Sequence, residues 1–445
     1  MTVRPLARPM PRRHPVDVSA DERPRAGRPA GARPLAIPRT RLRREAHQPD
    51  YVILVSVVGL VAIGILMVYS SSAMNAYAAY DDTLRIVGPQ VVWGTIGLAT
   101  MVVMSRVDYR WLRLASIPMF IGALVLLVVV LLPGLGIRIG GSARWLQFGP
   151  LPAVHPAEFA KLAMVVYLAH WLARRGDRVK SFWHGTVPFL VIFAPVLILV
   201  LREPDLGTSA VIGITGFVMF FAAGATLWHI AAIGGLGVGI VLFSLSRNPY
   251  QLERVTAFLD PWKDPLGTGF HTIQGLFALA LGGIVGAGLG ESRQAGGLFL
   301  PNAWNDYVFA IVGEEFGLIG AVVVISLFVL FAYRGIRVAL AAPDTFGALL
   351  AAGVTTWICV QAFINIGVVV SLIPVTGITL PFVSAGGSSL IVSFAAVGIL
   401  LSVSREAGAS GSWNDAGPHR GRRHGRAHLP GPRRRPVADD APERA

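Results

Sequence analysis

The chain has 445 residues, of which 53% are hydrophobic and only 14% are charged, and its mean hydropathy is +0.60. Soluble domains carry about 25% charged residues, so this composition excludes a soluble globular protein and indicates an integral membrane protein. The single cysteine, Cys359, lies in an apolar segment, which excludes both a disulfide framework and a cysteine metal cluster.

The formal net charge of +14 belongs mostly to the two ends of the chain. Residues 1–50 hold 12 Lys and Arg against 5 Asp and Glu, and residues 405–445 hold 9 against 5. Both ends are rich in Arg and Pro, so we expect two basic, disordered tails beside an anionic cytoplasmic leaflet rather than nucleic-acid-binding modules. The first fifty residues lack the apolar core of a cleavable signal peptide. Residues 51–404 are then one polytopic membrane domain.

Membrane-crossing segments are recognised by length, because a helix needs about 20 apolar residues to span the hydrocarbon core. The candidate stretches are 51–73, 86–105, 113–133, 157–174, 184–201, 205–224, 227–246, 306–333, 346–371 and 386–404. Ten spans place both ends of the chain on the same side of the membrane. The sequence therefore predicts an all-α integral membrane protein of about ten transmembrane helices, with a long extracytoplasmic loop between helices 7 and 8.

The distribution of Lys and Arg assigns the two sides, since short cytoplasmic loops carry an excess of positive charge. The basic positions outside the tails are Arg106, Arg110, Arg113, Arg174, Arg175, Arg178, Lys180, Arg334 and Arg337. They share a side with both tails, which is then cytoplasmic, although the turn near residue 225 has no Lys or Arg. The loops predicted to face outward are 74–85, 134–156, 202–204, 247–305 and 372–385.

The longest outward loop, residues 247–305, is rich in Gly, and its segment 273–289 is apolar enough to lie on or dip into the membrane. A loop of this length is usually functional or disordered, and the apolar content argues against disorder. Upstream, Arg254 either meets a lipid-linked phosphate or is an ordinary interfacial arginine.

Residues 259–274 of this loop, LDPWKDPLGTGFHTIQ, combine charge with turn residues. Pro261 and Pro265 disfavour helical backbone at the preceding Asp260 and Asp264, and the following glycines permit tight turns. A carboxylate on such an elbow at the membrane edge suits a general base, which points to Asp264. A plain solvated loop is the alternative.

Charged residues within the apolar segments need a partner or a purpose. Glu158 and Lys161 are spaced i,i+3 and share a helix face. Either Glu158 caps the helix and pairs internally with Lys161, or Lys161 and Arg144 together bind an anion such as a phosphate. His155 beside them is expected to be structural.

Two further stretches carry carboxylates near the outer surface. In LREPDLGTSA (201–210), Arg202, Glu203 and Asp205 form either a polar turn or part of a site. Past the long loop, Glu314 and Glu315 follow Asp306 in an apolar helix, where they either line a site or brace the structure. Asp306 either caps that helix or joins the site.

These stretches, taken in order, resemble the motifs of the SEDS family (shape, elongation, division and sporulation), whose members include FtsW and RodA. The matching runs are Arg144-Trp145 before HPAEFAK, EPDLGT at 203–208, DPLGTGFHTIQ, Asn305-Asp306 with GEEFG, and PVTGITLPFVSAGGSS at 374–389. Pro261-Trp262 ahead of Asp-Pro is more similar to the FtsW branch than to the RodA branch. The chain departs from the family pattern at His155, Ala157, Phe270 and Ala385.

The resemblance implies a peptidoglycan glycosyltransferase that polymerises lipid II at the outer face of the bacterial cytoplasmic membrane during cell division. It implies a class B penicillin-binding protein as partner, other divisome proteins nearby and a place at the division septum. Asp264 matches the proposed catalytic carboxylate of the family. The substrate-binding positions that we expect are Arg144, Glu158, Lys161, Arg254, Asp306, Glu314, Glu315, Ser384 and Ser388.

The sequence leaves open both what stabilises the leaving group and which of three functions the chain has. A departing diphosphate is stabilised either by the cations or by a divalent metal such as Mg²⁺ or Mn²⁺ held partly by carboxylates, and no other cofactor is implied. A lipid II flippase is the alternative to a polymerase, with the intramembrane charges lining a passage for the head group. A non-catalytic scaffold is the third interpretation.

Overall fold

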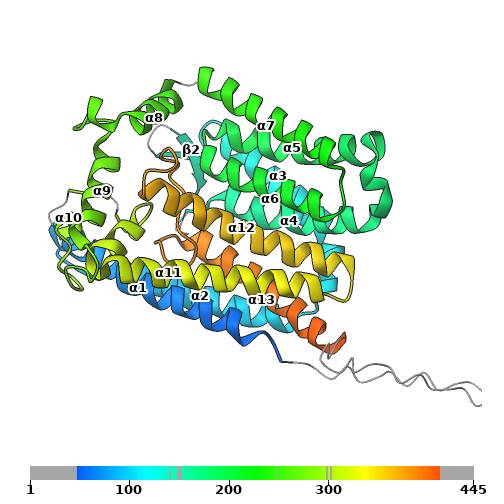
Figure 1. Ribbon diagram of the computed structural model, residues 1–445, viewed down its shortest axis with the longest axis horizontal. Helices are drawn as coiled ribbons and strands as arrows, with labels where there is room; N and C mark the ends of the chain where they lie inside the picture. Colours follow the sequence, from blue (N-terminus) through cyan, green and yellow to red (C-terminus); the bar gives the residue numbers. More distant parts are fainter. Residues whose placement is uncertain are drawn as a thin grey trace, which may run out of the picture. The chain divides into compact units, whose positions relative to one another are not determined.

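The computed structural model describes residues 48–139, 142–147, 153–247, 249–296, 299–300 and 303–410. The predicted tails lie almost wholly outside these ranges. Each of the ten predicted spans forms a helix (Figure 1). These helices are α1 (Tyr51–Tyr80), α2 (Val87–Arg106), α3 (Leu112–Leu131), α4 (Pro156–Arg175), α5 (Val187–Arg202), α6 (Leu206–Ala222), α7 (Leu227–Arg247), α11 (Val308–Ala341), α12 (Thr345–Val369) and α13 (Gly387–Ser410).

Within the described ranges, eight helices are long and apolar enough to cross a membrane. The other two long helices are special cases: α6 is apolar but has only 17 residues, and α4 carries the charges of Glu158 and Lys161. Most of α4 is buried, and both Glu158 and Lys161 face protein rather than lipid. The predicted all-helical membrane protein is confirmed.

The basic loops meet at one end of the bundle, on the right in Figure 1. Asp50 caps α1, and its carboxylate forms an ion pair with Arg334 at 2.6 Å. The backbone N–H of Asp50 donates a hydrogen bond to Ser404 Oγ at 3.2 Å. Arg405 donates to the carbonyl of Ser105 at 3.0 Å. The start of α1 and the ends of α2, α11 and α13 therefore gather at one end, as the charge pattern predicts for the cytoplasmic side.

The loops predicted to face outward gather at the opposite end. Loop 132–155 holds a small antiparallel hairpin of β1 (Gly136–Ile139) and β2 (Ser142–Leu146), which the sequence pattern did not predict. From β2, Arg144 reaches the turn between α5 and α6, and the N–H of His155 donates to Ser388 Oγ at 3.4 Å. This end of the bundle holds the candidate site.

The long outward loop folds into short helices, namely α8 (Pro249–Leu259), a 3-10 turn (Pro261–Lys263), α9 (Phe270–Gly282) and α10 (Arg293–Gly296). Helix α9 packs on α11 so closely that a Cβ on Gly282 would come within 1.9 Å of the carbonyl oxygen of Gly313. Helix α11 breaks at Gly317, where φ is +63°. Beside this break, Ala287 and Gly288 donate backbone hydrogen bonds to α11 at 2.9 and 3.0 Å. The apolar segment 273–289 is therefore built into the fold.

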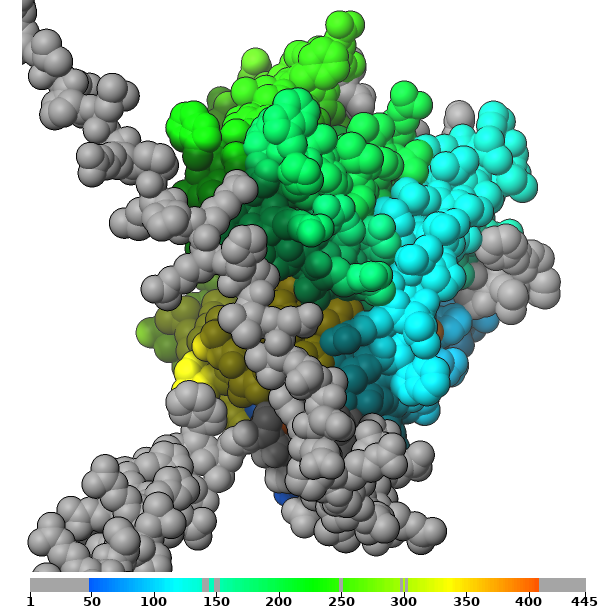
Figure 2. All heavy atoms as spheres, turned by 90° about the vertical axis from the view of Figure 1, so that its right-hand side faces the viewer, coloured from blue at the N-terminus to red at the C-terminus, as the bar shows by residue number. Residues whose placement is uncertain are grey.

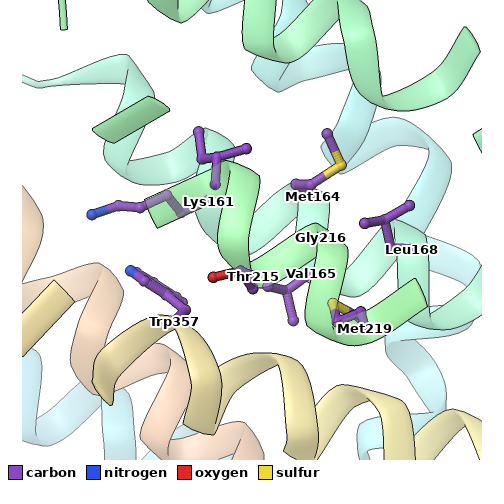
Figure 3. Close-up of a pocket in the computed structure, with 9 residues that line it drawn as sticks. Lys161, Met164, Val165, Leu168, Thr215, Gly216, Met219 and Trp357 are labelled. Atoms are coloured by element: carbon purple, nitrogen blue, oxygen red, sulfur yellow. The ribbon is translucent and has the colours of Figure 1, made fainter. Parts of the chain in front are cut away.

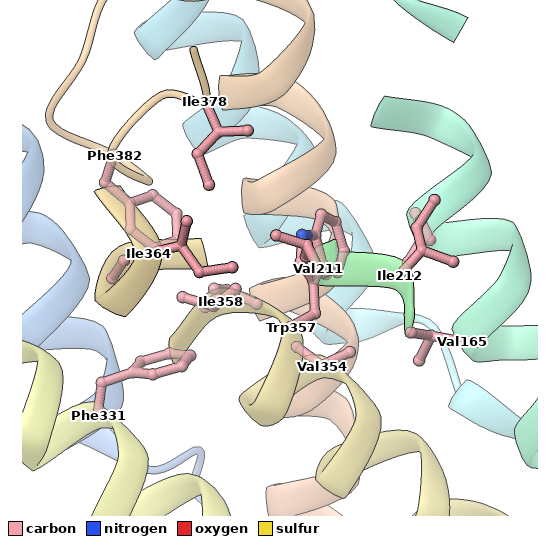
Figure 4. Close-up of a cluster of buried hydrophobic side chains, with 14 of the residues drawn as sticks. Val165, Val211, Ile212, Phe331, Val354, Trp357, Ile358, Ile364, Ile378 and Phe382 are labelled. Carbon is pink, nitrogen blue, oxygen red and sulfur yellow. The ribbon is translucent and has the colours of Figure 1, made fainter. Parts of the chain in front are cut away.

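The core surrounds α12, whose side chains interlock with those of α4, α6 and α11 (Figure 4). Trp357 and Ile358 are fully buried there, beside Val165 of α4 and Val211 of α6. Because lipid is as apolar as these side chains, close packing rather than the hydrophobic effect holds such helices together. The packed core fixes the outer ends of α4 and α12, where the charged residues of the site begin.

Candidate active site

Lys161 is held on the inner face of α4 by partners from two helices. Its Nζ lies 2.9 Å from Glu158 Oε1 and 2.7 Å from Gln361 Oε1, and 5.3 Å from the ring centre of Trp357. Figure 3 shows Lys161 and Trp357 on facing helices, beside a space of only about 10 Å³. The internal ion pair that the sequence allowed does form, and both side chains are buried.

Two amides on α12 complete this polar layer, although neither was predicted from the sequence. Gln361 accepts from both Lys161 and Trp357 Nε1 and donates to the carbonyl of Thr379 at 3.0 Å. One turn further on, Asn365 donates to the carbonyls of Asp306 and Ile378, at 2.8 Å in each case. Their i,i+4 spacing in an apolar helix was the available signal, since it places both amides on one face. They tie α12 to the outward loops.

Arg144 holds the turn between α5 and α6. It donates to the carbonyl oxygens of Glu203 at 3.0 Å and Pro204 at 2.6 Å rather than to a carboxylate. The neighbouring Asp205 caps α6 through Thr208, and its Oδ2 lies 3.8 Å from His155 Nε2. The expected structural role of His155 fits its place in this contact.

The Glu203 carboxyl group is completely buried, and neither of its oxygens has a hydrogen-bond partner within the part of the chain that the structure describes. Burial, together with the nearby Asp205, raises the pKa of Glu203 to about 8. At neutral pH this side chain is therefore protonated and adds no negative charge to the site.

Arg254 of α8 and Asp306 face the same region from the long outward loop. Arg254 donates to the carbonyl of Val375 at 3.2 Å. Burial raises the pKa of Asp306 to about 6, and the positive charge of Arg254 opposes this rise. Asp306 is thus ionised at neutral pH, with the opposite charge of Arg254 in its surroundings. The structure places both residues at the outer end, with Arg144.

Asp264, the predicted base, lies in the exposed turn between the 3-10 segment and α9. Its Oδ1 accepts from the N–H of Gly267 at 3.1 Å, and its Oδ2 accepts from the N–H of Thr268 at 2.8 Å. A Cβ on Gly267 would come within 2.2 Å of this carboxylate, so the turn depends on that glycine. In the described chain, no hydrogen bond or ion pair joins Asp264 to Arg144 or Lys161. Asp264 is at the outer end and faces solvent.

Glu314 and Glu315 are buried and brace the long loop. Glu314 accepts from Ser292 Oγ at 2.5 Å and from the N–H groups of Arg293 at 2.8 Å and Gln294 at 3.3 Å. Glu315 accepts from the hydroxyl of Ser70 on α1. These contacts match the bracing alternative, and a role of either residue in substrate binding stays a prediction.

The predicted serines hold the segment between α12 and α13. Ser384 is buried, and its Oγ accepts from the N–H of Leu380 at 2.8 Å while its carbonyl accepts from Gln90 at 3.1 Å. Ser388 is half-buried at the start of α13, beside His155. Ser388 is thus linked through His155 to Asp205, next to the turn that Arg144 holds.

A large apolar cavity of about 640 Å³ lies among α5, α6, α7 and α8. Its wall consists mainly of aliphatic and aromatic side chains such as Phe193, Phe217 and Leu242. Pro204 and Arg254 also line it, so the cavity reaches the turn that Arg144 holds. An apolar chamber that meets cations at one side can hold an amphiphile with an anionic head.

The carboxylates of the outer end do not gather into a site for a divalent metal. Across the described ranges, no three Asp, Glu, His or Cys side chains lie close enough to hold one ion. Asp205 is engaged as a helix cap and Glu203 is buried, so these two neighbouring carboxylates do not form a site. Arg144 and Arg254 are the cations that the structure places at this end.

The fold and the site define a polytopic, all-helical membrane protein with a charged end, predicted to face outward, that adjoins an apolar chamber. The family model described as "Cell cycle protein", which covers FtsW, RodA and SpoVE, matches residues 51–409. The chain belongs to this family, and the predicted SEDS membership is confirmed.

Relatives extend over nearly the whole membrane domain. The chain is 41% identical over 361 residues to the "Probable peptidoglycan glycosyltransferase FtsW" of Geobacter metallireducens, covering 81% of this chain and 96% of the relative. It is 43% identical over 357 residues to the "Stage V sporulation protein E" of Bacillus subtilis, covering 80% and 97%.

Solved structures share the fold. One is a chain solved for the "Structural coordination of polymerization and crosslinking by a peptidoglycan synthase complex", with a TM-score of 0.65, 30% identity, and coverage of 81% of this chain and 98% of that one. Another is the rod shape determining protein RodA of Thermus thermophilus, with a TM-score of 0.59, 28% identity, and coverage of 81% and 97%.

Proposed function

We propose that this chain, a peptidoglycan glycosyltransferase of the FtsW type, polymerises lipid II into glycan strands at the outer face of the bacterial cytoplasmic membrane. The enzyme class rests on the FtsW relatives that carry this activity in their names. The substrate, an undecaprenyl diphosphate linked to a disaccharide-pentapeptide, combines a long apolar tail, an anionic linker and sugar hydroxyls. Each of these parts has a matching feature at the outer end.

The observation that carries the proposal is that the apolar cavity adjoins two cations, Arg144 and Arg254. Arg254 and Pro204 line the cavity, while Arg144 donates to the Pro204 carbonyl at 2.6 Å. A lipid tail in the cavity would therefore bring its diphosphate to Arg144 and Arg254, with Lys161 behind them on α4. Burial of the apolar tail favours binding, and the cations fix the position of the head.

In the transfer step, the hydroxyl of the acceptor sugar attacks the anomeric carbon of the donor. The bond between that carbon and the diphosphate oxygen breaks, and undecaprenyl diphosphate leaves with the bonding electrons. Arg144, Lys161 and Arg254 stabilise the charge that develops on it. Asp264 takes the hydroxyl proton, a task that an exposed carboxylate can perform once the acceptor reaches the turn.

The partner and the place of action follow from the same assignment. The similar chain from the peptidoglycan synthase complex supports a complex in which this chain polymerises and a class B penicillin-binding protein cross-links. The gathering of the basic loops at one end supports cytoplasmic termini and an outward-facing site. Action at the division septum rests on the similarity to the relatives named FtsW.

The shape of the cavity favours transfer over the flippase alternative. A flippase needs a polar passage through the whole bilayer, whereas the cavity of about 640 Å³ is walled by apolar side chains. At the level of Lys161, the space beside the ion pair is only about 10 Å³, room for about one water molecule. The cavity therefore suits a lipid tail and does not suit a sugar head group.

The test is glycan polymerisation from purified lipid II, with the transpeptidase partner present. Asp264→Asn is expected to lower the rate at least ~100-fold, the usual contribution of a general base. Asp260→Asn is the matched control, because Asp260 is exposed in the same turn and its side chain makes no capping hydrogen bond. Full activity of Asp264→Asn, with unchanged melting of both variants, would contradict the assignment of the base.

A further inference from the structure

Another cavity, which is polar and has a volume of about 410 Å³, lies at the cytoplasmic end of the bundle, away from the outward-facing site. Figure 2 looks onto this end, where α3 (cyan) lies beside the helices that follow it (green). The cavity lies between the start of α3, the end of α4 and the start of α12. Its polar walls are Arg113, His170, Arg174 and Asp344, and Phe346 adds an aromatic surface.

The single carboxylate among the residues that line this cavity is fully occupied. Asp344 Oδ1 caps α12 through the N–H of Gly347 at 2.8 Å and lies 3.1 Å from Arg113 Nη2. Its Oδ2 accepts from the hydroxyl of Tyr109 at 3.0 Å and from Arg110 Nε at 3.4 Å. Asp344 therefore already neutralises other arginines and has no free lone pair for a further cation.

Among the described residues that line the cavity, Arg174 is the arginine that forms no ion pair with Asp344. Within the described residues, its polar contact is with His170 Nε2, at 3.5 Å. His170 Nδ1 lies 2.9 Å from both Ser116 Oγ and the carbonyl oxygen of Arg113, so the ring is held by α3 while its Nε2 faces Arg174. The guanidinium of Arg174 is thus oriented at the cavity, but its charge is not cancelled there.

The α3 wall of the cavity borders lipid. Trp111 and Leu114, on either side of Arg113, are 66% and 73% exposed, and Ile117 one turn further on is 54% exposed. Large apolar side chains that point outward from a membrane helix face acyl chains, and tryptophan marks the interface with the head groups. The cavity is therefore at head-group depth in the cytoplasmic leaflet.

We propose that this cavity binds the phosphodiester head group of an anionic phospholipid from the cytoplasmic leaflet. Arg174 supplies the uncancelled positive charge, and Arg113 is held in place 4.8 Å above the Phe346 ring. Basic pockets between transmembrane helices on the cytoplasmic side are suited to such head groups. The acyl chains would lie along Leu114 and Ile117. A free phosphate offers the same oxygens but has no chains for this apolar wall.

The experiment is native mass spectrometry of the full-length chain, titrated with phosphatidylglycerol, with phosphatidylethanolamine of the same acyl chains, and with inorganic phosphate. We expect the chain to retain phosphatidylglycerol and Arg174→Gln to weaken that binding about fivefold, the effect of one basic residue near a membrane surface. Arg178→Gln, on the exposed turn after α4 and outside the cavity, is the matched control and should bind as the wild type does.

Three results would overturn the proposal. Equal retention of phosphatidylethanolamine would show that charge does not matter, and displacement of the lipid by equimolar inorganic phosphate would show a site for free anions. Unchanged binding by Arg174→Gln would place the lipid elsewhere. Because Arg174 is exposed, its replacement should leave the fold intact, and an unchanged melting temperature without lipid checks this.

Discussion

The buried ion pair of Lys161 and Glu158 either stabilises the fold alone or also helps to bind the substrate. Substitutions at the two positions can distinguish these roles. The Lys161 side chain is 3% exposed and that of Glu158 is 11% exposed, with 2.9 Å between Nζ and Oε1. Removing one partner of a buried pair leaves an uncompensated charge and costs about 3–5 kcal/mol. Loss of the contact with the Trp357 ring, 5.3 Å away, adds about 1 kcal/mol.

Lys161→Met is therefore expected to lower the free energy of unfolding by about 4–6 kcal/mol. The double variant Glu158→Gln/Lys161→Met buries no charge, so it should recover most of that loss. Gln361 keeps Trp357 Nε1 as a donor in both variants. Thermal and denaturant unfolding of the purified chain in detergent, arranged as a double-mutant cycle, measures the coupling between the two side chains.

Activity of the double variant separates the two roles of Lys161. If Lys161 stabilises the departing diphosphate, the stable double variant should still polymerise lipid II with a kcat/KM about 10–100-fold below the wild type, the worth of one charged hydrogen bond. Recovery of both stability and activity would show that Lys161 is structural only. A single variant as stable as the wild type would refute the energetics of the buried pair.

Two other positions give direct tests. Arg144→Gln should raise the KM for lipid II about tenfold or more, because it removes a guanidinium that donates to the carbonyls of Glu203 and Pro204 and can also bind the diphosphate. Steady-state polymerisation measures this change. Unchanged KM would remove Arg144 from the site. Glu314→Ala should expose the loop that Glu314 clamps, because three hydrogen bonds are lost, and hydrogen exchange of residues 292–296 should rise at least ~10-fold. Unchanged exchange there would mean that other contacts hold the loop.

Much of the fold could be predicted because lipid imposes simple rules on sequence. Apolar runs of the right length predicted the ten helices, and the distribution of Lys and Arg predicted which loops gather at the same end. Features made by tertiary contact could not be read in this way. The break in α11 depends on hydrogen bonds between Gly283 and Leu318 and between Ile284 and Ile319, residues more than thirty positions apart in the chain. The β1–β2 hairpin likewise had no apolar run to mark it.

The site was predictable where charge stands out against an apolar background. Lys161 and Glu158 were singled out in this way, and their pairing was one of the two alternatives that the sequence left open. Gln361 and Asn365 were missed because neutral amides do not stand out as charges do, although both organise the layer around Lys161. Which of two roles a residue takes is decided by its partners, and those partners lie on other helices. Arg144, predicted as an anion ligand, is at the same time the brace of the turn at Pro204.

The raised pKa of the Glu203 carboxyl group predicts a pH dependence of substrate binding at the outer end. The basic side chains there are Arg144, Lys161 and Arg254, and the carboxyl groups other than Glu203 are Glu158, Asp205 and Asp306. The two sets are equal in number, and Glu203, whose pKa burial raises to about 8, is one further carboxyl group.

Above that pH, Glu203 adds one negative charge beside Arg144, and a diphosphate should bind more weakly. We therefore expect the KM for lipid II to rise between about pH 7 and 9 in the wild type, around the raised pKa of Glu203. The KM should stay flat in Glu203→Gln, which has the same size and no charge to gain. An equal rise in both proteins would mean that another group titrates. The buried carboxyl group of Glu203 would then have no part in recognition of the substrate.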